Sequence, residues 1–236
     1  MQSPSTIRSL MQWFAAFWLS LVLLLPVCLF GFLARPLGWR VLALWSRCQM
    51  RLFGVSLQVD DHNHGQYPKP PYVFVLLNQT SLAEAFVAPH ALPLPFQILT
   101  NIEFAMVPFV GWAVASLGAV VVVRQWPKQA RRGLDRAVAQ MRRGVNFYMS
   151  IEGARSRTGA LLPYKKGPAV LAIATGASII PVMVTGAREI WPHGSWRVAP
   201  GTIKYTIGKP VSVEGLTYQD RDAVVQTLWQ VASGGC

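Results

Sequence analysis

The hydrophobic pattern divides the chain into an apolar N-terminal part and a longer part in which the apolar runs are short. No charged residue occurs from position 9 to position 34, and residues 13–33 are almost wholly apolar. A helix needs about 20 such residues to span a bilayer, so the pattern predicts a transmembrane helix. Pro26 and Pro36 also permit a hairpin that enters the membrane and returns, and both arrangements stay open at this point.

Basic residues follow the apolar segment and indicate its orientation. Four arginines lie within residues 35–51, against one arginine and the amino terminus before the segment. By the positive-inside rule, the chain after the segment lies on the cytoplasmic side. Arg40, Arg47 and Arg51 are spaced by seven and four residues, so they share one stripe of a helix. This spacing predicts an interfacial helix over residues 37–53.

After residue 54, short β-type runs alternate with helical ones, which favours an α/β fold with a central sheet flanked by helices. The predicted strands are residues 55–59, 72–77, 120–123, 145–151, 179–184 and 203–207, and the predicted helices are 81–91, 128–143, 166–176 and 218–232. The chain is therefore divided into membrane anchor and interfacial helices at 1–53 and a second domain at 54–236.

A second uncharged stretch, residues 104–123, raises the question of another membrane span. Pro108, Gly111 and Gly118 interrupt it, and residues 120–123 are all β-branched. We therefore expect a buried turn of helix followed by a core strand there.

Composition and charge narrow the class of protein. Of the 236 residues, 52% are hydrophobic and 14% are charged, which excludes a disordered chain. The net charge of +12 accompanies a mean hydropathy of +0.33. Basic and apolar character together favour an anionic membrane surface over nucleic acid as the partner.

No metal site or disulfide framework is expected from the cysteines and histidines. Cys28, Cys48 and Cys236 are scattered, which is typical of a reducing compartment. Two histidines at 62 and 64 lie in a polar turn and are expected to be solvent-exposed. His90 and His193 are isolated in the sequence, and no function is predicted for either of them.

The first candidate site is the sequence NQTSLAEAF, which begins at Asn78 directly after a predicted strand. Asn78, Gln79, Ser81 and Glu84 combine polar and ionisable groups with apolar neighbours. A plain helix cap is the alternative, because Ser81 as N-cap with Glu84 three residues later forms a capping box.

The second candidate site is IEGARSRTGALLPYKKG, residues 151–167, which again follows a strand. Arg155, Arg157, Lys165 and Lys166 stand close together among glycines and could cradle a phosphate. A solvated basic loop is the alternative. Residues 124–166, however, hold 11 basic and 2 acidic residues, and this concentration favours an anionic partner.

The order of these segments resembles the 1-acylglycerol-3-phosphate (lysophospholipid) acyltransferase family. The hallmarks of that family are an Asn-His-four residues-Asp motif after a strand and a later Glu-Gly-Thr-Arg-Ser-Arg motif. The resembling blocks are NIEFAMVPFVG at 101–111, EGARSRTG at 152–159, LLPYKKG at 161–167 and IIPVMVTG at 179–186. The similarity extends from about residue 72 to residue 186.

The chain departs from the family pattern at the first motif and at two other positions. Gln79 stands where the family has its catalytic His, and Glu84 stands where it has Asp; Asn101 replaces Lys and Ala154 replaces Thr. The family His takes the proton from the acceptor hydroxyl, which a Gln side chain cannot do.

Two hypotheses follow from this replacement. Glu84 could act as the base while Gln79 positions the hydroxyl, since an apolar setting raises a carboxyl pKa. Alternatively, the base is lost and the chain is a catalytically impaired member that binds lipid or acts as a scaffold.

The resemblance implies an acyltransferase that moves a fatty acyl group from acyl-CoA or acyl-ACP to the free hydroxyl of a lysophospholipid, above all 1-acylglycerol-3-phosphate, which gives phosphatidic acid. It implies no tightly bound cofactor and no metal. The expected partners are anionic membrane lipids and the lysophospholipid acceptor, with acyl carrier protein as a candidate. Nucleic acid is not expected as a partner. The expected location is the inner (cytoplasmic) membrane, with the catalytic domain facing the cytoplasm.

The resemblance also assigns residues to the site. Gln79 and Glu84 would be catalytic. The residues expected to bind substrate are Asn78, Ser81, Glu103, Glu152, Gly153, Arg155, Ser156, Arg157, Lys165 and Lys166.

Overall fold

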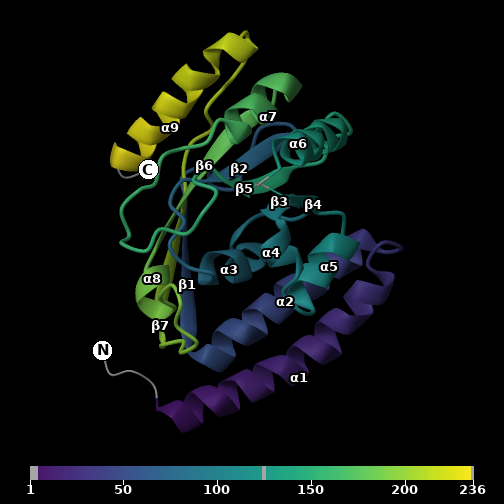
Figure 1. Cartoon of the computed structure of the whole chain (residues 1–236), viewed down its shortest axis with the longest axis vertical. Coiled ribbons are helices and arrows are strands. Elements are labelled where there is room, and N and C mark those ends of the chain that lie inside the picture. Colours follow the sequence, from purple (N-terminus) through teal and green to yellow (C-terminus); the bar gives the residue numbers. More distant parts are fainter. Residues whose placement is uncertain (1–4, 124–125, 235–236) are drawn as a thin grey trace.

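The computed structural model describes residues 5–123 and 126–234, so Arg124 and Cys236 of the sequence arguments lie outside the described residues. One seven-stranded sheet runs through the described chain in the order β1-β7-β6-β2-β5-β3-β4 (Figure 1). The strands are β1 (Val55–Asp61), β2 (Tyr72–Leu76), β3 (Gln97–Asn101), β4 (Val120–Val122), β5 (Phe147–Ser150), β6 (Ser178–Thr185) and β7 (Gly201–Ile207).

All neighbouring strands are parallel except β6 and β7, which are antiparallel. The centre of the sheet is β2, which pairs with β6 on one side and with β5 on the other; Leu76 of β2 lies opposite Ser150 of β5. Because β2, β5 and β3 are parallel, the loops after their carboxyl ends meet at one edge of the sheet.

Helices cover both faces of the sheet (Figure 1). They are α1 (Thr6–Phe30), α2 (Arg35–Phe53), α3 (Ala83–Ala91), α4 (Ile102–Ala105), α5 (Val110–Ser116), α6 (Pro127–Met141), α7 (Gly167–Thr175), α8 (Ala187–Ile190) and α9 (Arg221–Gly234), with a 3-10 turn, η1, at Tyr218–Asp220. On one face lie α6, α7 and α9, and on the other lie α1, α2, α3 and α5.

The alternation of side chains along β2 divides the core into two layers. Phe74 and Leu76 pack towards α1, α2 and α3, whereas Val73 and Val75 pack towards α6, α7 and α9. All five residues of β2 are buried. A parallel strand that is covered on both faces is expected to be apolar at every position, as this one is.

The N-terminal helices share the core of the domain. The buried face of α1 repeats every three or four residues, at Ser9, Gln12, Ala16, Ser20, Leu24 and Val27. From α2, Trp39, Leu42 and Trp45 enter the same core layer as β2. The sequence boundary between residues 53 and 54 therefore separates two patterns of hydrophobicity, while the side chains on both sides pack together.

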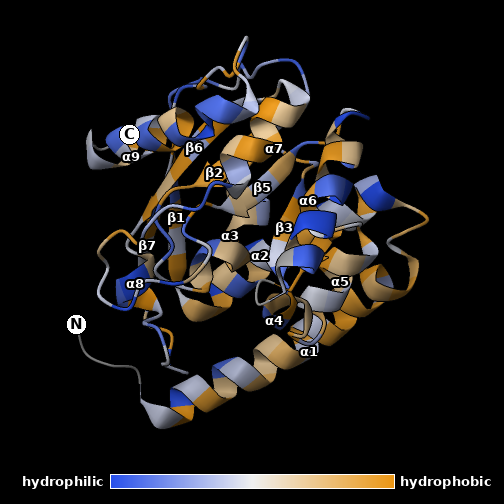
Figure 2. Cartoon of the chain, turned by 45° about the horizontal axis from the view of Figure 1, so that its top comes forward, coloured by the Kyte–Doolittle hydropathy of each residue, from blue (hydrophilic) through white to orange (hydrophobic). Residues whose placement is uncertain are grey.

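The opposite face of α1 is apolar and exposed, and Figure 2 shows orange residues along this helix, most densely towards its C-terminal half. Its exposed large side chains are Ile7, Leu10, Met11, Phe14, Phe17, Trp18, Val22, Leu25, Leu29 and Phe30. By length and composition α1 could cross a membrane, and it is the one such helix among the described residues.

All six predicted strands and all four predicted longer helices are present, with ends shifted by a few residues. The uncharged stretch 104–123 contains α5 and β4, which confirms the expected helical turn and core strand. The sequence-based expectation missed β3, because QILTN is short and has polar residues at three of its five positions.

Candidate active site

A hollow of about 760 Å³ lies where the loops after β2, β5 and β3 meet. Five of the sequence-predicted site residues line it: Gln79, Glu103, Gly153, Arg155 and Arg157. The parallel arrangement of the three strands explains this meeting of residues that are up to 78 positions apart in the sequence. Five of the other predicted site residues hold the surrounding loops in place, namely Asn78, Ser81, Glu84, Glu152 and Ser156.

The loop after β2 is fixed by its polar side chains. The Asn78 side chain donates to the carbonyl of Val184 at 2.7 Å, and its oxygen accepts from the Val184 N–H at 2.9 Å. The Ser81 hydroxyl donates to the carbonyl of Trp191 at 2.7 Å. These contacts anchor the loop to β6 and α8 and leave the Gln79 side chain at the hollow.

Glu84 is buried away from the hollow, whereas the sequence-based hypothesis places it beside the reacting hydroxyl. Its side chain is 1% exposed and is not among the lining residues of the hollow. One carboxylate oxygen accepts from the Thr80 N–H, the Thr80 hydroxyl and the Ser81 N–H at 2.8 to 3.0 Å. Glu84 therefore holds the turn that carries Gln79, as one half of the helix-cap alternative expected, although the N-cap of α3 is Leu82 and not Ser81.

Burial also changes the acidity of Glu84. Desolvation raises its pKa to about 7, although the hydrogen bonds from Thr80 and Ser81 oppose the shift. The second carboxylate oxygen is buried without a hydrogen-bond partner among the described residues. Such an oxygen favours the protonated form, which agrees in direction with the raised pKa.

Glu152 joins the two candidate loops. Its side chain is 2% exposed, and its two carboxylate oxygens accept from the Gln79 N–H at 2.5 Å and from the Leu162 N–H at 2.6 Å. Burial raises its pKa, against these two hydrogen bonds. Glu152 is therefore a positioning residue and not, as expected from the sequence, a direct contact of the substrate phosphate.

The basic residues of the second loop separate into two pairs. Arg155 and Arg157 line the hollow, and no hydrogen bond from either guanidinium group is present within the described residues. Gly153, with φ +71°, makes the tight turn that starts this loop, a conformation that glycine adopts readily. Ser156 is buried and accepts from the Gly159 N–H, so it shapes the loop.

Lys165 and Lys166 differ from the two arginines in their position relative to the hollow. Neither lines the hollow, and Lys166 pairs with Asp222 of α9 at 2.7 Å. The two lysines lie at the start of α7, beyond the turn that Leu162 closes on Glu152. Proximity in the sequence therefore did not mean proximity in the site.

The third side of the hollow comes from the end of β3. Asn101 caps the short helix α4 through the Ile102 N–H at 2.8 Å, and its amide donates to Glu103 at 2.7 Å. Both residues line the hollow. Glu103 thus belongs to the wall of the hollow, with its carboxylate tied to the end of β3.

An apolar cavity of about 280 Å³ adjoins the polar hollow. It is bounded by α1, α2, α3 and the segment 107–110, with Trp13, Trp45 and Phe86 among its walls, and Val107 lines both spaces. An elongated apolar group that reaches the hollow could therefore extend into this cavity.

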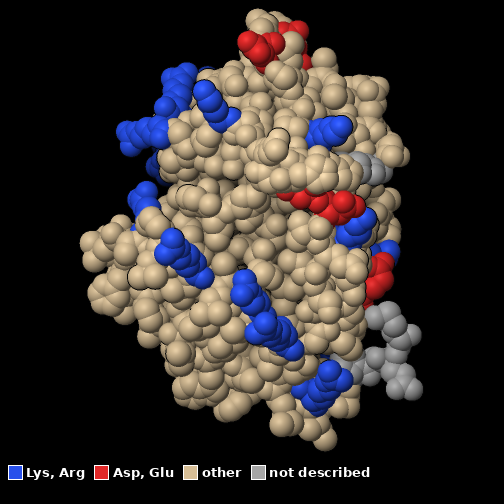
Figure 3. All heavy atoms as spheres, turned by 180° about the vertical axis from the view of Figure 1, so that it is seen from behind, with Lys and Arg blue, Asp and Glu red and all other residues tan. Residues whose placement is uncertain are grey.

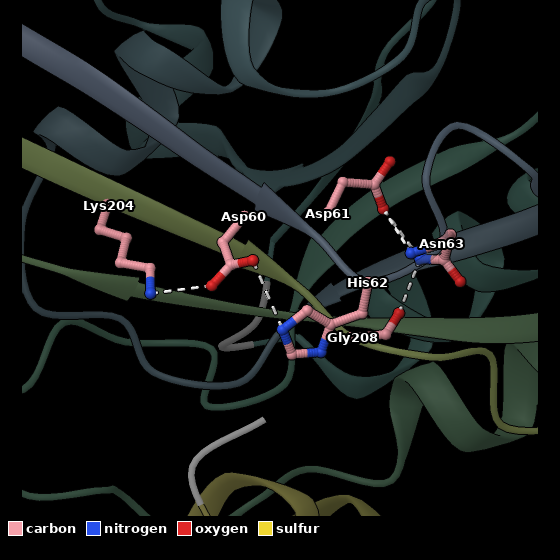
Figure 4. A network of polar contacts seen from close by, with 6 residues as sticks. All are labelled: Asp60, Asp61, His62, Asn63, Lys204 and Gly208. Carbon is pink, nitrogen blue, oxygen red and sulfur yellow. Dashed lines mark hydrogen bonds and ion pairs between the residues drawn. The ribbon is translucent and has the colours of Figure 1, made fainter.

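A second polar cluster lies at the end of β1, and Figure 4 shows its contacts. Asp60 pairs with Lys204 of β7 at 2.8 Å, and His62 lies 3.6 Å from Asp60; Asp61 accepts from the Asn63 N–H. These contacts close a turn and join two strands. Among the described residues no group of His, Cys, Asp or Glu side chains could hold a metal ion.

Sequence reasoning missed two ionisable residues of the hollow, Tyr148 of β5 and His193. His193, in the loop after α8, lies at the same hollow as Gln79. Its isolation in the sequence gave no signal, because the contact depends on α8 folding back over the loop after β2.

Comparison with known proteins shows the family and the fold of the chain. The family model described as Acyltransferase matches residues 58–185. A chloroplastic 1-acyl-sn-glycerol-3-phosphate acyltransferase of Brassica napus is 29% identical over 117 residues, which cover 49% of this chain and 34% of the relative. The 1-acyl-sn-glycerol-3-phosphate acyltransferase of Pseudomonas aeruginosa is 30% identical over 149 residues, which cover 63% of this chain and 57% of the relative.

The chain thus spans about a third of the first relative and somewhat more than half of the second. Among solved structures, the 1-acyl-sn-glycerophosphate acyltransferase PlsC of Thermotoga maritima superposes with a TM-score of 0.76. Its sequence is 20% identical, and the match covers 97% of this chain and 96% of that chain. This likeness concerns the fold, including the central sheet and the N-terminal helices.

Proposed function

The chain belongs to the acyltransferase family, and on this premise we propose that it transfers a fatty acyl group from an acyl thioester to the free hydroxyl of a lysophospholipid. The acceptor that fits best is 1-acylglycerol-3-phosphate, which becomes phosphatidic acid. The proposal rests mainly on one observation, that a hollow lined by Arg155 and Arg157 adjoins an apolar cavity.

The phosphate of the acceptor would bind to Arg155 and Arg157. A guanidinium group offers several N–H donors in a plane, which suits a phosphate, and neither group donates to a protein acceptor among the described residues. Glu103 and Asn101, across the hollow, would contact the polar glycerol part through hydrogen bonds.

An acyl chain would lie in the apolar cavity. The walls belong to α1, α2 and α3 and are almost entirely apolar, and Val107 stands at the junction with the hollow. A thioester whose chain enters this cavity would leave its carbonyl carbon at the hollow, within reach of the acceptor hydroxyl. The donor is proposed to be acyl-CoA or acyl-ACP, used as a co-substrate.

Gln79 would orient the acceptor hydroxyl by a hydrogen bond through its side-chain amide. Glu84 would act through the turn that it holds, because its carboxylate is buried behind Thr80 and Ser81. This assignment changes the sequence-based hypothesis that Glu84 is the base.

The N-terminal helices would bind the chain to the cytoplasmic face of the inner membrane. The exposed side of α1 is apolar, and Arg35, Arg40, Arg47 and Arg51 of α2 are exposed. Figure 3 shows basic side chains in a diagonal row across the part of the molecule formed by these helices. An apolar face beside a row of cations suits a bilayer that contains anionic lipids.

The test is acyl transfer by the purified full chain in mixed micelles, with labelled acyl-CoA and acyl-ACP donors and a panel of lysolipids. We expect transfer to 1-acylglycerol-3-phosphate to exceed transfer to lysolipids without a phosphate monoester. Arg155→Ala should raise the acceptor KM by about 10- to 100-fold, as for the loss of a charge-assisted hydrogen bond.

Lys165→Ala is the matched control, because it removes a cation from the same basic segment at a position outside the hollow. It should leave the acceptor KM within about twofold of the wild type. The absence of transfer from every donor, together with lipid binding that Arg155→Ala weakens, would instead support the impaired, lipid-binding alternative.

A further inference from the structure

His193 lies at the hollow that contains Gln79, although the two residues are far apart in the sequence. It follows α8 in a turn at residues 193–194 and is exposed. The proposed reaction requires a group that accepts a proton from the acceptor hydroxyl, and the amide of Gln79 cannot do so.

The loop that carries His193 is tied directly to the loop that carries Gln79. The Trp191 carbonyl accepts from the Ser81 hydroxyl at 2.7 Å, and the Trp191 indole donates to the Ser195 carbonyl at 2.8 Å. The Trp191 ring packs against Phe86 with ring centroids 5.6 Å apart. His193 therefore lies in a short closed segment whose base is fixed against α3 and the first motif loop.

The other ionisable side chains that line the hollow beside His193 are Glu103, Tyr148, Arg155 and Arg157. Arginine keeps its proton under all ordinary conditions, and burial raises the pKa of Tyr148 far above neutrality. Glu103 already accepts a hydrogen bond from the Asn101 amide, which ties its carboxylate to the end of β3. Glu84 does not line the hollow.

We propose that His193 is the general base of the acyl transfer, in place of the histidine that the first motif lacks. This inference rests on the function proposed above. An imidazole nitrogen of neutral His193 takes the proton of the acceptor hydroxyl while the hydroxyl oxygen attacks the thioester carbonyl carbon.

The carbon–sulfur bond then breaks, and the imidazolium of His193 gives its proton to the leaving thiolate. The products are the acyl ester and the free thiol, and His193 returns to its neutral form. Gln79 holds the hydroxyl in line with the imidazole, so the two functions of one motif histidine are divided between two loops.

The experiment compares the full-length wild type with His193→Gln and His193→Asn in the acyl-transfer assay. We expect kcat to fall by about 10²- to 10⁴-fold with little change in the acceptor KM. The acidic limb of the wild-type pH profile, which reports a base that must be deprotonated, should be absent from the variants. His90→Gln is the matched control, because His90 in α3 does not line the hollow, and it should retain wild-type kcat.

Three results would overturn the inference. Variants within about threefold of the wild-type kcat would leave the proposed function intact and remove His193 from the mechanism. An increase in acceptor KM at constant kcat would assign His193 to binding alone. A wild type that transfers no acyl group from any donor would reject the proposed function itself, and the inference with it.

Discussion

The loops after β2 and β5 are built in a similar way but offer different chemistry to the hollow. Each is held by a glutamate that is almost completely buried and accepts backbone N–H groups, Glu84 in the first turn of α3 for the first loop and Glu152 within the second. The side chains that face the hollow are the neutral amide of Gln79 in one loop and the guanidinium of Arg155 in the other.

The two loops show that the residues that fix the shape of a loop differ from the residues that face the hollow. The buried carboxylates set the shape of both loops, so they are sensitive to removal but need not touch a substrate. The β5 loop keeps the cations that an anionic acceptor requires, whereas the β2 loop has no group that can take a proton at the hollow. Substitutions in the two loops therefore test whether the carboxylates are structural and whether the anion site is confined to Arg155 and Arg157.

The largest effect is expected for Glu152→Ala. The substitution leaves the N–H groups of Gln79 and Leu162 without an acceptor, and each buried donor without a partner costs about 1–3 kcal/mol. The free energy of unfolding, measured with urea, should fall by roughly 2–6 kcal/mol, and acyl transfer should be lost because both loops shift.

Glu152→Gln is the control, since it keeps one oxygen as an acceptor and should lose less stability than the alanine variant. A fully stable Glu152→Ala protein with a raised acceptor KM would contradict the positioning role and return Glu152 to the binding site.

The next effect concerns the pH dependence of stability through Glu84. Burial raises its pKa from 4.5 to about 7, so between these pH values the folded state binds more protons than the unfolded state. The stabilisation is present below pH 4.5 and is lost as the pH rises to about 7, by an amount on the order of 3 kcal/mol. Urea unfolding at several pH values measures this slope.

Glu84→Gln should flatten the slope, because the amide oxygen still accepts from Thr80 and Ser81 but does not titrate. The same variant should retain most acyl transfer. A decrease in kcat of about 10²-fold or more, in protein that remains folded, would support Glu84 as the base. Glu84 would then differ from Glu152, which has a positioning role.

A smaller effect is expected for Asn78→Ala in the β2 loop. The substitution removes two hydrogen bonds to Val184 and should lower the free energy of unfolding by about 1–3 kcal/mol. The acceptor KM should remain within about threefold of the wild type. An unchanged melting temperature with a large rise in KM would show that Asn78 binds substrate, as the sequence predicted.

The smallest effect is expected for Lys166→Ala beside the β5 loop. Its partner Asp222 is exposed, and pairs of this kind contribute little to stability. Both the melting temperature and the acceptor KM should match the wild type within error. A tenfold rise in KM would extend the anion site beyond Arg155 and Arg157.

Most of the fold was predictable from the sequence because its strands are apolar and its helices are periodic. The strand β2 and the helix α6 depend mainly on local pattern, and both were identified. The strand β3 was not, because Gln97 and Asn101 are polar and their side chains form hydrogen bonds with the Leu117 carbonyl and with α4. Local pattern carries no information about such partners.

The candidate site was predictable only in part. Arg155 and Arg157 were identified from the resemblance of their motif, and the structure brings them to the hollow. Lys166 has the same charge and lies in the same basic segment, yet it pairs with α9. Glu84 and Glu152 carry the residue type expected of catalysis, but their burial makes them part of the framework.

By itself, the sequence determined the family resemblance, the α/β class, the apolar N-terminal helix and the concentration of positive charge, because these depend on residue type and spacing along the chain. Only the tertiary structure decided which polar side chains face the hollow, that α1 and α2 share the core, and that His193 lies near Gln79. The physical reason is that parallel strands bring their carboxyl ends together from distant parts of the chain, and hydrogen bonds such as that from Ser81 to Trp191 fix how the loops meet.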